Sequence, residues 1–386
     1  MKNEQSAKSV LVFDTYYPGV LRNLLIHKKF KNDYFYQKKI LEVEQFGFGT
    51  GSAYVDAFRK LGWKAELYVP NSLGLQGLWS KEKLNRKVVG FGWDWIQVAS
   101  RIPMIRRILF LLPSFYKVID WQVKHCSPDV VYIQDLNAFP PFLVKKIAKN
   151  CKVVYGEIAS PPPPKDFFRN YDRIISALPP ILDQVAEIGV PNSYLALGFD
   201  QRFSWVSEGS IRDIDVAFVG SITRLQPKTV PLLKAISSLI PNLEIYGDID
   251  VTILRENGLE SYYRGQAWGL DMWKILSRSK IIINRHGSIA QNFAVNMRMF
   301  EATGSGALLV TEDMVNLEQL FSPNGEVVVY KSNSEAANLI EYYLRNDSEL
   351  EKIATSGQKR TLKEHTYMKR IERLIEIIES DLEPLN

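Results

Sequence analysis

The sequence predicts an α/β protein built from two parallel β-sheets, each covered by helices, in two successive domains. Three observations support this fold class. The chain has 386 residues, which is more than one ordinary hydrophobic core accommodates. Short, β-branched apolar segments alternate with helical patterns through the first half. The same alternation begins again near residue 213, after a segment that shows neither pattern.

The first half is expected to form a parallel sheet with helices between its strands. The expected strands are Ser9–Phe13, Ala65–Val69, Val130–Ile133, Lys152–Tyr155 and Arg173–Ser176. The expected helices between them are Ser52–Leu61, Phe142–Lys149 and Ile181–Ile188. Sheets of this type place functional residues at the carboxyl ends of their strands.

The second half repeats this arrangement. Its expected strands are Asp213–Val219, Leu243–Tyr246, Lys280–Asn284, Ala307–Thr311 and Glu326–Val329. Its expected helices are Thr229–Leu239, Leu270–Ser277 and Val295–Ala302. The sequence therefore predicts an N-terminal domain at 1–200, a linker at 201–212 and a C-terminal domain at 213–365.

The last 21 residues, 366–386, contain an amphipathic helix near Thr366–Ser380. Its apolar residues recur at i, i+3, i+4 and i+7, so one face is expected to be buried. This helix is expected either to pack within its own domain or to cross back and brace the first domain.

Composition limits the classes of protein to consider. The chain is 46% hydrophobic and 24% charged, values that are typical of a folded globular protein. Cys126 and Cys151 are too few and too distant for a disulfide framework or a zinc site. The N-terminus lacks the apolar run of a signal peptide, and no uncharged stretch approaches the roughly 20 residues of a membrane span. We expect a cytoplasmic protein.

Positive charge is concentrated in the first half of the chain. Residues 1–200 contain 27 Lys and Arg against 18 Asp and Glu, whereas residues 201–386 contain 21 against 25. The stretch 101–121 is basic, aromatic and amphipathic, and it includes Arg101, Arg106, Arg107 and Lys117. It could rest on the inner face of an anionic membrane, or pack into the first domain with its basic face in solvent. Dispersed charge without a recognition motif argues against nucleic acid.

The glycine run FGFGTGS at residues 46–52 is the most conspicuous motif of the first half. Gly47, Gly49 and Gly51 precede an expected helix, as the glycines of a dinucleotide site do. However, the first strand ends about thirty residues earlier, and no carboxylate follows the next strand at Val69. We expect these glycines to let a cleft-lining loop approach its surroundings closely, at a helix N-terminus that could hold an anion.

A more specific pattern lies in residues 279–313, SKIIINRHGSIAQNFAVNMRMFEATGSGALLVTED. The expected strand delivers Arg285 and His286 to its carboxyl end, and the next helix carries Asn296, Arg298 and Glu301. A carboxylate on this helix could accept ribose hydroxyls, while loop amides and the helix N-terminus hold phosphate. The alternatives are a simple Arg298–Glu301 surface pair and a structural histidine.

The segment FVGSITRLQPK contributes further candidates to the same domain. Gly220 and Ser221 directly follow the first strand of the second half. Arg224 and Lys228 come next, and their charges could neutralise a diphosphate leaving group. The convergence of these residues on strand ends of one domain predicts a binding site for a nucleotide.

These segments resemble a known family. SRSKIIINRHG, NMRMFEATGSGALLVTED, LFSPNGEVVVY and GQKRTLKEHTYMKRIERL are similar, in order and spacing, to the C-terminal domain of spore-maturation-type (CgeB-like) glycosyltransferases. The resemblance is dense over residues 213–375 and continues thinly into the first half through SPDVVYIQDLN and YDRIISALPP.

The resemblance implies a GT-B enzyme, with two Rossmann-like domains facing a cleft and a nucleotide-sugar donor (UDP-, GDP- or dTDP-linked) bound by the second. By position, Glu301 matches the ribose-binding glutamate of the related retaining class, and Arg224 and Lys228 match its basic pair near the diphosphate. That class has a second glutamate eight residues earlier, where this chain has Phe293. His286 or Asn292 could take its place, and the stereochemical outcome stays open.

Such enzymes hold the leaving diphosphate without a divalent metal, so we expect no metal and no cofactor. If the reaction inverts configuration, the first domain must supply a general base at a strand end. Asp14, Asp135 and Glu157 each follow an expected strand and are the candidates.

The predicted function is transfer of a sugar from a nucleotide-diphosphate sugar to a glycan, glycoprotein or lipid-linked acceptor. A nucleotide-sugar 2-epimerase of the same architecture is one alternative. A catalytically inactive protein that binds a nucleotide or a glycan is the other.

Overall fold

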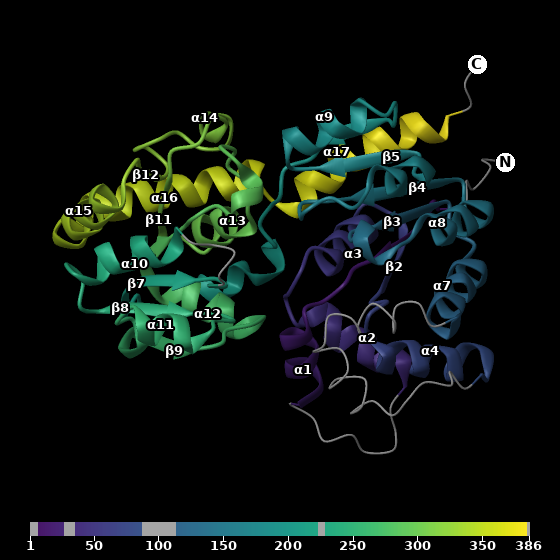
Figure 1. Ribbon diagram of the computed structural model, residues 1–386, viewed down its shortest axis with the longest axis horizontal. Helices are drawn as coiled ribbons and strands as arrows, with labels where there is room; N and C mark the ends of the chain where they lie inside the picture. Colours follow the sequence, from purple (N-terminus) through teal and green to yellow (C-terminus); the bar gives the residue numbers. More distant parts are fainter. Residues whose placement is uncertain (1–6, 27–34, 87–112, 223–227, 384–386) are drawn as a thin grey trace. The chain divides into compact units, whose positions relative to one another are not determined.

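The computed structural model describes residues 7–26, 35–86, 113–222 and 228–383, which fall into two compact units (Figure 1). Unit 1 comprises residues 1–195 together with 371–386, and unit 2 comprises residues 196–370. Each unit contains one six-stranded sheet whose strand pairs are all parallel. The predicted α/β class with two parallel sheets is therefore confirmed.

The sheet of unit 1 has the strand order β2-β1-β3-β4-β5-β6. Its strands are β1 (Ser9–Phe13), β2 (Lys64–Tyr68), β3 (Val130–Ile133), β4 (Val153–Glu157), β5 (Arg173–Ser176) and β6 (Asn192–Tyr194). Its helices are α1 (Pro18–Ile26), α2 (Tyr36–Gln45), α3 (Gly51–Lys60), α4 (Leu73–Leu84), α7 (Pro113–Cys126), α8 (Pro141–Ile147) and α9 (Pro179–Ala186). The short 3₁₀ helices η1 (Leu136–Ala138), η2 (Ala148–Asn150) and η3 (Lys165–Asn170) lie between them.

The sheet of unit 2 has the order β12-β11-β10-β7-β8-β9. Its strands are β7 (Ile214–Val219), β8 (Leu243–Tyr246), β9 (Tyr263–Gly265), β10 (Ser279–Ile283), β11 (Leu308–Glu312) and β12 (Val328–Tyr330). Its helices are α10 (Thr229–Ser237), α11 (Val251–Glu256), α12 (Leu270–Arg278), α13 (Met297–Gly304), α14 (Leu317–Leu320), α15 (Asn333–Arg345) and α16 (Asp347–Glu364). Three 3₁₀ helices, η4 (Gln201–Ser207), η5 (Glu260–Tyr262) and η6 (Ser288–Ala290), complete it.

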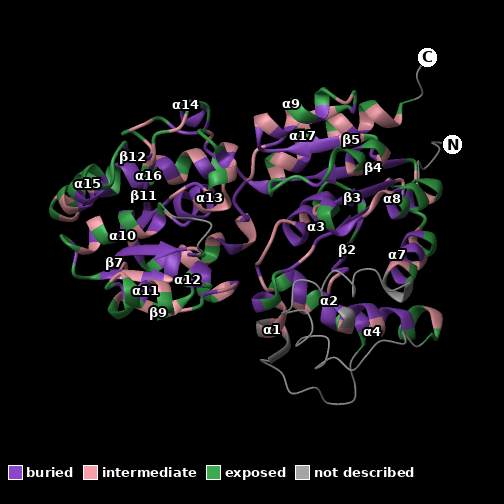
Figure 2. Ribbon diagram, viewed as in Figure 1, coloured by how far each residue is buried: buried purple, intermediate pink, exposed green. Residues whose placement is uncertain are grey.

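The central strands explain why the apolar runs were visible in the sequence. Every residue of β3 and of β4 is buried, as expected for parallel strands covered on both faces (Figure 2). The edge strands β6 and β9 have three residues each and no fully buried position, and the sequence pattern did not predict them. The predicted strands β2 and β8 alternate buried residues with exposed or partly exposed ones, so an alternating pattern was also sufficient to predict a strand.

The final helix, α17 (Tyr367–Leu382), joins unit 1 from Ile371 onward. Ile371, Leu374 and Ile378 are buried on its apolar face. Asp381 accepts two hydrogen bonds of 2.7 Å from the guanidinium of Arg173 on β5, and it also contacts the Tyr155 hydroxyl on β4. The C-terminal helix therefore braces the first sheet, beside β4 and β5 (Figure 1).

Residues 201–212, predicted to be a linker, fall within unit 2. The η4 segment packs there because Phe203 stacks on Trp273 of α12, with ring centroids 5.2 Å apart. The segment is polar enough to look like a linker, but one aromatic side chain anchors it.

Candidate functional site

Three carboxylates meet at the carboxyl edge of the unit 1 sheet. Asp14 and Asp135 follow the adjacent strands β1 and β3, and Glu157 is the last residue of β4, next in the sheet. The sequence placed Glu157 two residues beyond its strand, and the structure corrects this because β4 continues through Gly156 and Glu157. The charges of Glu157 and Asp135 both act on Asp14. The three predicted base candidates thus form one cluster.

Glu157 is held inside the protein by three donors. Its carboxylate accepts hydrogen bonds from the Tyr54 hydroxyl at 3.2 Å, the Tyr132 hydroxyl at 2.8 Å and Gln134 Nε2 at 3.3 Å. Burial raises the pKa of Glu157, and these hydrogen bonds oppose that rise. Most of its acceptor positions are therefore occupied by buried side chains.

Asp135 is also engaged by its surroundings. Its Oδ2 accepts a hydrogen bond of 2.7 Å from Thr15 Oγ1, and its Oδ1 accepts one of 3.1 Å from the backbone amide of Asn137. The second bond caps η1. Asp135 is thereby fixed between the loop after β1 and the start of η1.

Asp14 lies beneath the glycine run. The backbone amide of Gly51, at the N-terminus of α3, donates to Asp14 Oδ2 at 3.1 Å. A Cβ atom at Gly49 would lie 2.8 Å from that oxygen, and one at Gly51 would lie 2.7 Å from Asp14 Cβ. The glycines are needed for this close approach, and Gly47 and Gly49 also have positive φ angles of 75°.

This arrangement answers the question that the glycine run raises. A carboxylate of the protein itself occupies the helix N-terminus where a phosphate would bind in a dinucleotide site. Burial raises the pKa of Asp14 to about 7, and the neighbouring charges of Glu157 and Asp135 add to this. The glycines therefore allow the loop to approach Asp14 closely, and Asp14 is a carboxylic acid with a raised pKa.

In unit 2 the strand ends carry a network of neutral polar side chains. Asn284, after β10, donates to Thr311 Oγ1 on β11 at 2.9 Å. Asn296 donates to Asn284 Oδ1 at 2.8 Å and accepts from the Met299 amide at 3.2 Å, which caps α13. Asn296 was predicted to bind the donor; in the structure it joins the helix start to the strand end.

His286 lies within this network and is 2% exposed. The Val295 amide donates to its Nδ1 at 3.3 Å, so the ring proton belongs on Nε2, which lies 3.4 Å from Thr311 Oγ1. Burial lowers the pKa of His286 to about 4. Both ring nitrogens therefore have partners within the protein, and the ring is neutral.

Arg285 and Lys228 lie on neighbouring elements. Arg285 donates to Thr229 Oγ1 at 3.3 Å, and its Nε lies 3.8 Å from Glu312 Oε1. Glu312 also accepts a hydrogen bond of 2.7 Å from the His286 amide. Lys228 is exposed at the start of α10, whereas Arg224 falls outside the described residues. Arg285 is thus held in place, and Lys228 projects from the surface.

Glu301 and Arg298 form a buried pair on α13. Arg298 Nη1 lies 2.8 Å from Glu301 Oε2, with side chains 16% and 6% exposed, so this is no surface pair. Arg298 Nε also donates to the Val219 carbonyl oxygen at the end of β7, at 2.9 Å. Burial raises the pKa of Glu301, and the Arg298 charge opposes the rise. Among the described residues, no group donates a hydrogen bond to this carboxylate, and Arg298 forms an ion pair with it without hydrogen-bond geometry.

The end of β7 is closely packed against the end of β8. Gly220 donates its amide to the Tyr246 carbonyl oxygen at 2.9 Å. Gly247 has a φ of +141°, and a Cβ there would lie 1.9 Å from the Gly220 carbonyl oxygen. Only glycine therefore fits at position 247. Ser221, next along the chain, is exposed.

Sequence reasoning missed the supporting residues of both sites. Tyr54 and Tyr132 look like core aromatics, and their hydroxyls become visible as Glu157 donors only in the fold. Asn284, Thr311 and Glu312 end strands that were predicted, so their position at a strand end was the available signal.

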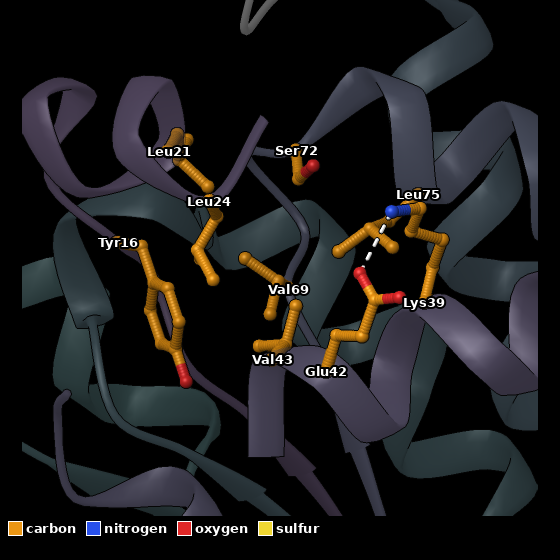
Figure 3. A pocket seen from close by; sticks show the side chains of 9 residues that line it. All are labelled: Tyr16, Leu21, Leu24, Lys39, Glu42, Val43, Val69, Ser72 and Leu75. Atoms are coloured by element: carbon orange, nitrogen blue, oxygen red, sulfur yellow. Dashed lines mark hydrogen bonds and ion pairs between the residues drawn. The ribbon is translucent and has the colours of Figure 1, made fainter. Parts of the chain in front are cut away.

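A small pocket lies in unit 1 beside α1, α2 and α4 (Figure 3). It has a volume of about 20 Å³, which suits one water molecule better than a sugar ring. Lys39 and Glu42 form an ion pair of 2.7 Å at its side. It is lined by Tyr16, Leu21, Leu24, Lys39, Glu42, Val43, Val69, Ser72 and Leu75. This pocket is too small to be the acceptor site by itself.

Two other sequence features can be located. Of the basic stretch 101–121, residues 101–112 lie outside the described part, and the remainder begins α7. Within the described part of the chain, no helix combines the length and apolarity that crossing a bilayer requires. The chain also has two Asp-x-Asp sequences, at 213–215 and 248–250, although the expectation of a metal-independent reaction rested in part on the absence of this motif. Asp213 and Asp215 pair with Arg278 and Lys280, and Asp250 caps α11.

Comparison with protein families identifies one domain. Residues 228–376 match the profile of a family described as glycosyl transferase-like. The matched segment runs from the start of α10 into α17 and contains Arg285, His286, Asn296, Arg298 and Glu301. No curated protein matches the sequence significantly. This stretch is thus similar to a glycosyl transferase-like family, and the predicted ribose ligand Glu301 lies within it.

Solved structures with a similar fold cover nearly the whole chain. A glycosyltransferase from Rickettsia africae is 10% identical, with a TM-score of 0.60 over 98% of this chain and 100% of that one. Sucrose-phosphate synthase from Thermosynechococcus elongatus is 12% identical, with a TM-score of 0.59 over 97% and 98%. Anabaena HepE, solved in complex with UDP-glucose, is 13% identical, with a TM-score of 0.58 over 96% and 99%. At these identities the likeness establishes the fold, which is GT-B.

Proposed function

We propose that this chain is a glycosyltransferase that moves a sugar from a nucleotide-diphosphate sugar to a hydroxyl of an acceptor. The observation that carries the proposal is the coincidence of the matched family domain with the buried Arg298–Glu301 pair at the strand ends of unit 2. An enzyme of this class is favoured over a 2-epimerase or an inactive binding protein, because the matched domain and the similar structures are glycosyltransferases.

Glu301 is the proposed ligand of the ribose. Its carboxylate has one protein partner, Arg298, which leaves acceptor positions for two sugar hydroxyls. Arg298 is itself fixed to the Val219 carbonyl oxygen, so it would hold the carboxylate in one orientation. A rigid carboxylate loses little conformational entropy when it binds a diol.

The diphosphate would lie near the ends of β7 and β10. Lys228, Arg285 and Arg224 are the cationic groups proposed to stabilise the charge that develops on the leaving diphosphate. The Gly220–Ser221 backbone after β7 is proposed to approach the phosphates. With these cations in that role, we propose that the reaction needs no divalent metal.

The finer assignments are also proposals. HepE has been solved with UDP and with UDP-glucose, which makes UDP the first nucleotide to test here. The acceptor is proposed to be a glycan, a glycoprotein or a lipid-linked sugar. The resemblance to spore-maturation-type enzymes supports that class, and the basic first half supports action at the cytoplasmic face of a membrane.

A thermal-shift titration tests the donor site. UDP, GDP, dTDP, CDP and ADP would be titrated with magnesium and with EDTA. A ligand at one hundred times its dissociation constant stabilises the folded state by about 2.7 kcal/mol. We expect one nucleotide to stabilise the protein equally in both buffers and Glu301→Ala to abolish the shift.

The matched control is Glu341→Ala, which removes a carboxylate from α15, on another helix of the same unit. This variant is expected to keep the full nucleotide shift. If no nucleotide stabilises the wild type, or if Glu301→Ala keeps the shift, the proposed donor site is wrong.

A further inference from the structure

The helices α7 and α8 of unit 1, together with η2 directly after α8, carry positive charge almost without negative charge. Residues 113–126 and 141–150 contain five Lys, one Asp and no Glu. All five lysines are exposed, whereas Asp120 is buried. The charge that these helices present to solvent is therefore positive. The lysines are Lys117, Lys124, Lys145, Lys146 and Lys149.

The lysines form two adjacent rows. On α7, Lys117 and Lys124 are seven residues apart, which places them on the same side of the helix. On α8 and η2, the other three lysines follow one another at spacings of three and four residues, which has the same effect. The rows meet, because Lys124 Nζ and Lys146 Nζ each lie 3.0 Å from Asp120 Oδ2. Figure 1 shows α7 and α8 as neighbours in unit 1.

Aromatic side chains lie beside these rows. The rings of Tyr116 on α7 and Phe142 on α8 meet edge to face, with centroids 5.2 Å apart, and Phe142 is 57% exposed. Trp121 of α7 is partly exposed, and the guanidinium of Arg86, just after α4, lies 4.7 Å from its ring centroid. Basic residues interleaved with aromatic ones are typical of surfaces that rest at the boundary between water and lipid.

Three of the lysines are not neutralised by the protein. Lys117, Lys145 and Lys149 form no ion pair within the described part of the chain, whereas Lys124 and Lys146 share one carboxylate. The sequence singled out only Lys117, as part of the basic stretch 101–121, and the fold brings the row on α8 and η2 beside it. The rows together therefore present a larger charged surface than the sequence indicated.

We propose that this surface binds an anionic phospholipid bilayer. We call it the basic face, and it consists of the five lysines and Phe142. The lysine ammonium groups contact lipid phosphates, while the aliphatic stems and the Phe142 ring enter the interface. This inference refines the proposed action at a membrane. It rests on the proposed function only for its purpose, which is to bring the enzyme to a lipid-linked acceptor.

The composition of the basic face favours a bilayer over a nucleic acid. α7, α8 and η2 contain no Arg, whose planar fork makes paired contacts to phosphates and bases. Lys is a point charge on an apolar stem, which suits a fluid layer of headgroups. An exposed Phe ring gains free energy when it leaves water for acyl chains. Both residue types therefore contribute to binding a bilayer.

The test measures binding of the full chain to lipid vesicles by co-sedimentation, without a nucleotide sugar. Vesicles of phosphatidylcholine mixed equally with phosphatidylglycerol are compared with vesicles of phosphatidylcholine alone. We expect binding to the anionic vesicles only. We also expect release at about 1 M salt, because the screening length then falls to about 3 Å.

Two variants test the residues of the basic face. Lys117→Gln, Lys145→Gln and Lys149→Gln combined should lower the affinity for anionic vesicles on the order of 100-fold, because each Lys near such a surface contributes about fivefold. Phe142→Ala should lower it about tenfold through the lost apolar contact. Both variants are expected to keep the nucleotide thermal shift of the wild type, since they leave unit 2 unchanged.

The matched control combines Lys234→Gln, Lys274→Gln and Lys352→Gln, which removes the same charge from exposed positions of unit 2. It should stay within about threefold of the wild-type affinity, because a change in net charge alone is screened beyond about 10 Å at 0.1 M salt.

The proposal is overturned if the wild type does not bind anionic vesicles, or if the triple variant of the basic face binds them as the wild type does. It is also overturned if single-stranded RNA binds as tightly as the vesicles and Phe142→Ala has no effect, since the surface is then a general polyanion site. Vesicle binding without any nucleotide shift or sugar transfer would contradict the proposed function and leave the basic face in place.

Discussion

The two sheets end in opposite kinds of chemistry, although both are six-stranded, parallel and built from the same kind of apolar strand. The carboxyl edge of the unit 1 sheet gathers three acids, one of them with a pKa of about 7. The edge of the unit 2 sheet gathers amides, a hydroxyl and a neutral histidine that satisfy one another. Folding disfavours the charge of Asp14 at the unit 1 edge, whereas at the unit 2 edge the polar groups named here are paired with one another and Glu301 is paired with Arg298.

The difference indicates a division of labour between the sites. A fully hydrogen-bonded network keeps a binding surface rigid. A carboxylate next to other carboxylates has a raised pKa and therefore takes up a proton more readily. The unit 2 edge is the proposed nucleotide site, whereas the unit 1 edge carries an acid whose pKa is raised.

The largest expected effect comes from disrupting the unit 2 edge at Gly247. Gly247→Ala places a carbon 1.9 Å from the Gly220 carbonyl oxygen at a φ of +141°, so both a clash and backbone strain result. We expect a loss of about 3–5 kcal/mol in the free energy of unfolding, measured with urea. Gly258→Ala, with a φ of +70° and nothing within 4 Å, is the control and should lose only about 1–2 kcal/mol. Equal losses would contradict the proposed packing of β7 against β8.

The next substitution, at the unit 1 edge, is expected to increase the free energy of unfolding instead of lowering it. Folding raises the pKa of Asp14 from 3.8 to about 7, so the native state holds the extra proton and wild-type stability falls as pH rises through this range. Asp14→Asn keeps an acceptor for the Gly51 amide and removes the charge. It should be more stable than wild type at pH 8, by at most about 4 kcal/mol, and should lose that advantage near pH 4.

Urea unfolding at a series of pH values measures this difference. Asp166→Asn, at a side chain that is 85% exposed, is the control. Its stability should differ little from that of wild type at every pH. If Asp14→Asn is less stable than wild type at pH 8, the ionised carboxylate of Asp14 stabilises the folded state instead of destabilising it.

A smaller effect is expected when the unit 2 network loses Asn296. Asn296→Ala removes the cap of α13 and leaves Asn284 Oδ1 without its donor, which should cost about 2 kcal/mol. Ser332→Ala removes the exposed cap of α15, where the hydroxyl accepts from the Glu335 amide and also contacts the Ser334 hydroxyl at 3.1 Å, and should cost about 1 kcal/mol. If both variants lose the same stability, the link from the helix to β10 contributes nothing.

The sequence predicted the features that depend on the burial of local segments and on their order along the chain. The central strands could be predicted because both of their faces are apolar. The strand-end positions of Asp14 and Asp135 followed from them, as did the position of Glu301 on the helix between two predicted strands. What could not be predicted were contacts between distant segments. Gly51 gave no sign that its amide would meet Asp14, 37 residues away, and Tyr132 gave no sign that its hydroxyl would reach Glu157. The short edge strands β6 and β9 were not predicted, because none of their residues is fully buried and their sequences contain no apolar run.

The most direct test of the central claim follows a nucleotide sugar by ¹H NMR in the presence of EDTA. UDP-glucose would be tried first, then the GDP- and dTDP-linked sugars, with and without an added glycan acceptor. For a glycosyltransferase we expect steady loss of the donor anomeric signal with equal formation of free nucleoside diphosphate. An unchanged sugar, or an epimerised sugar still joined to its nucleotide, would contradict glycosyl transfer.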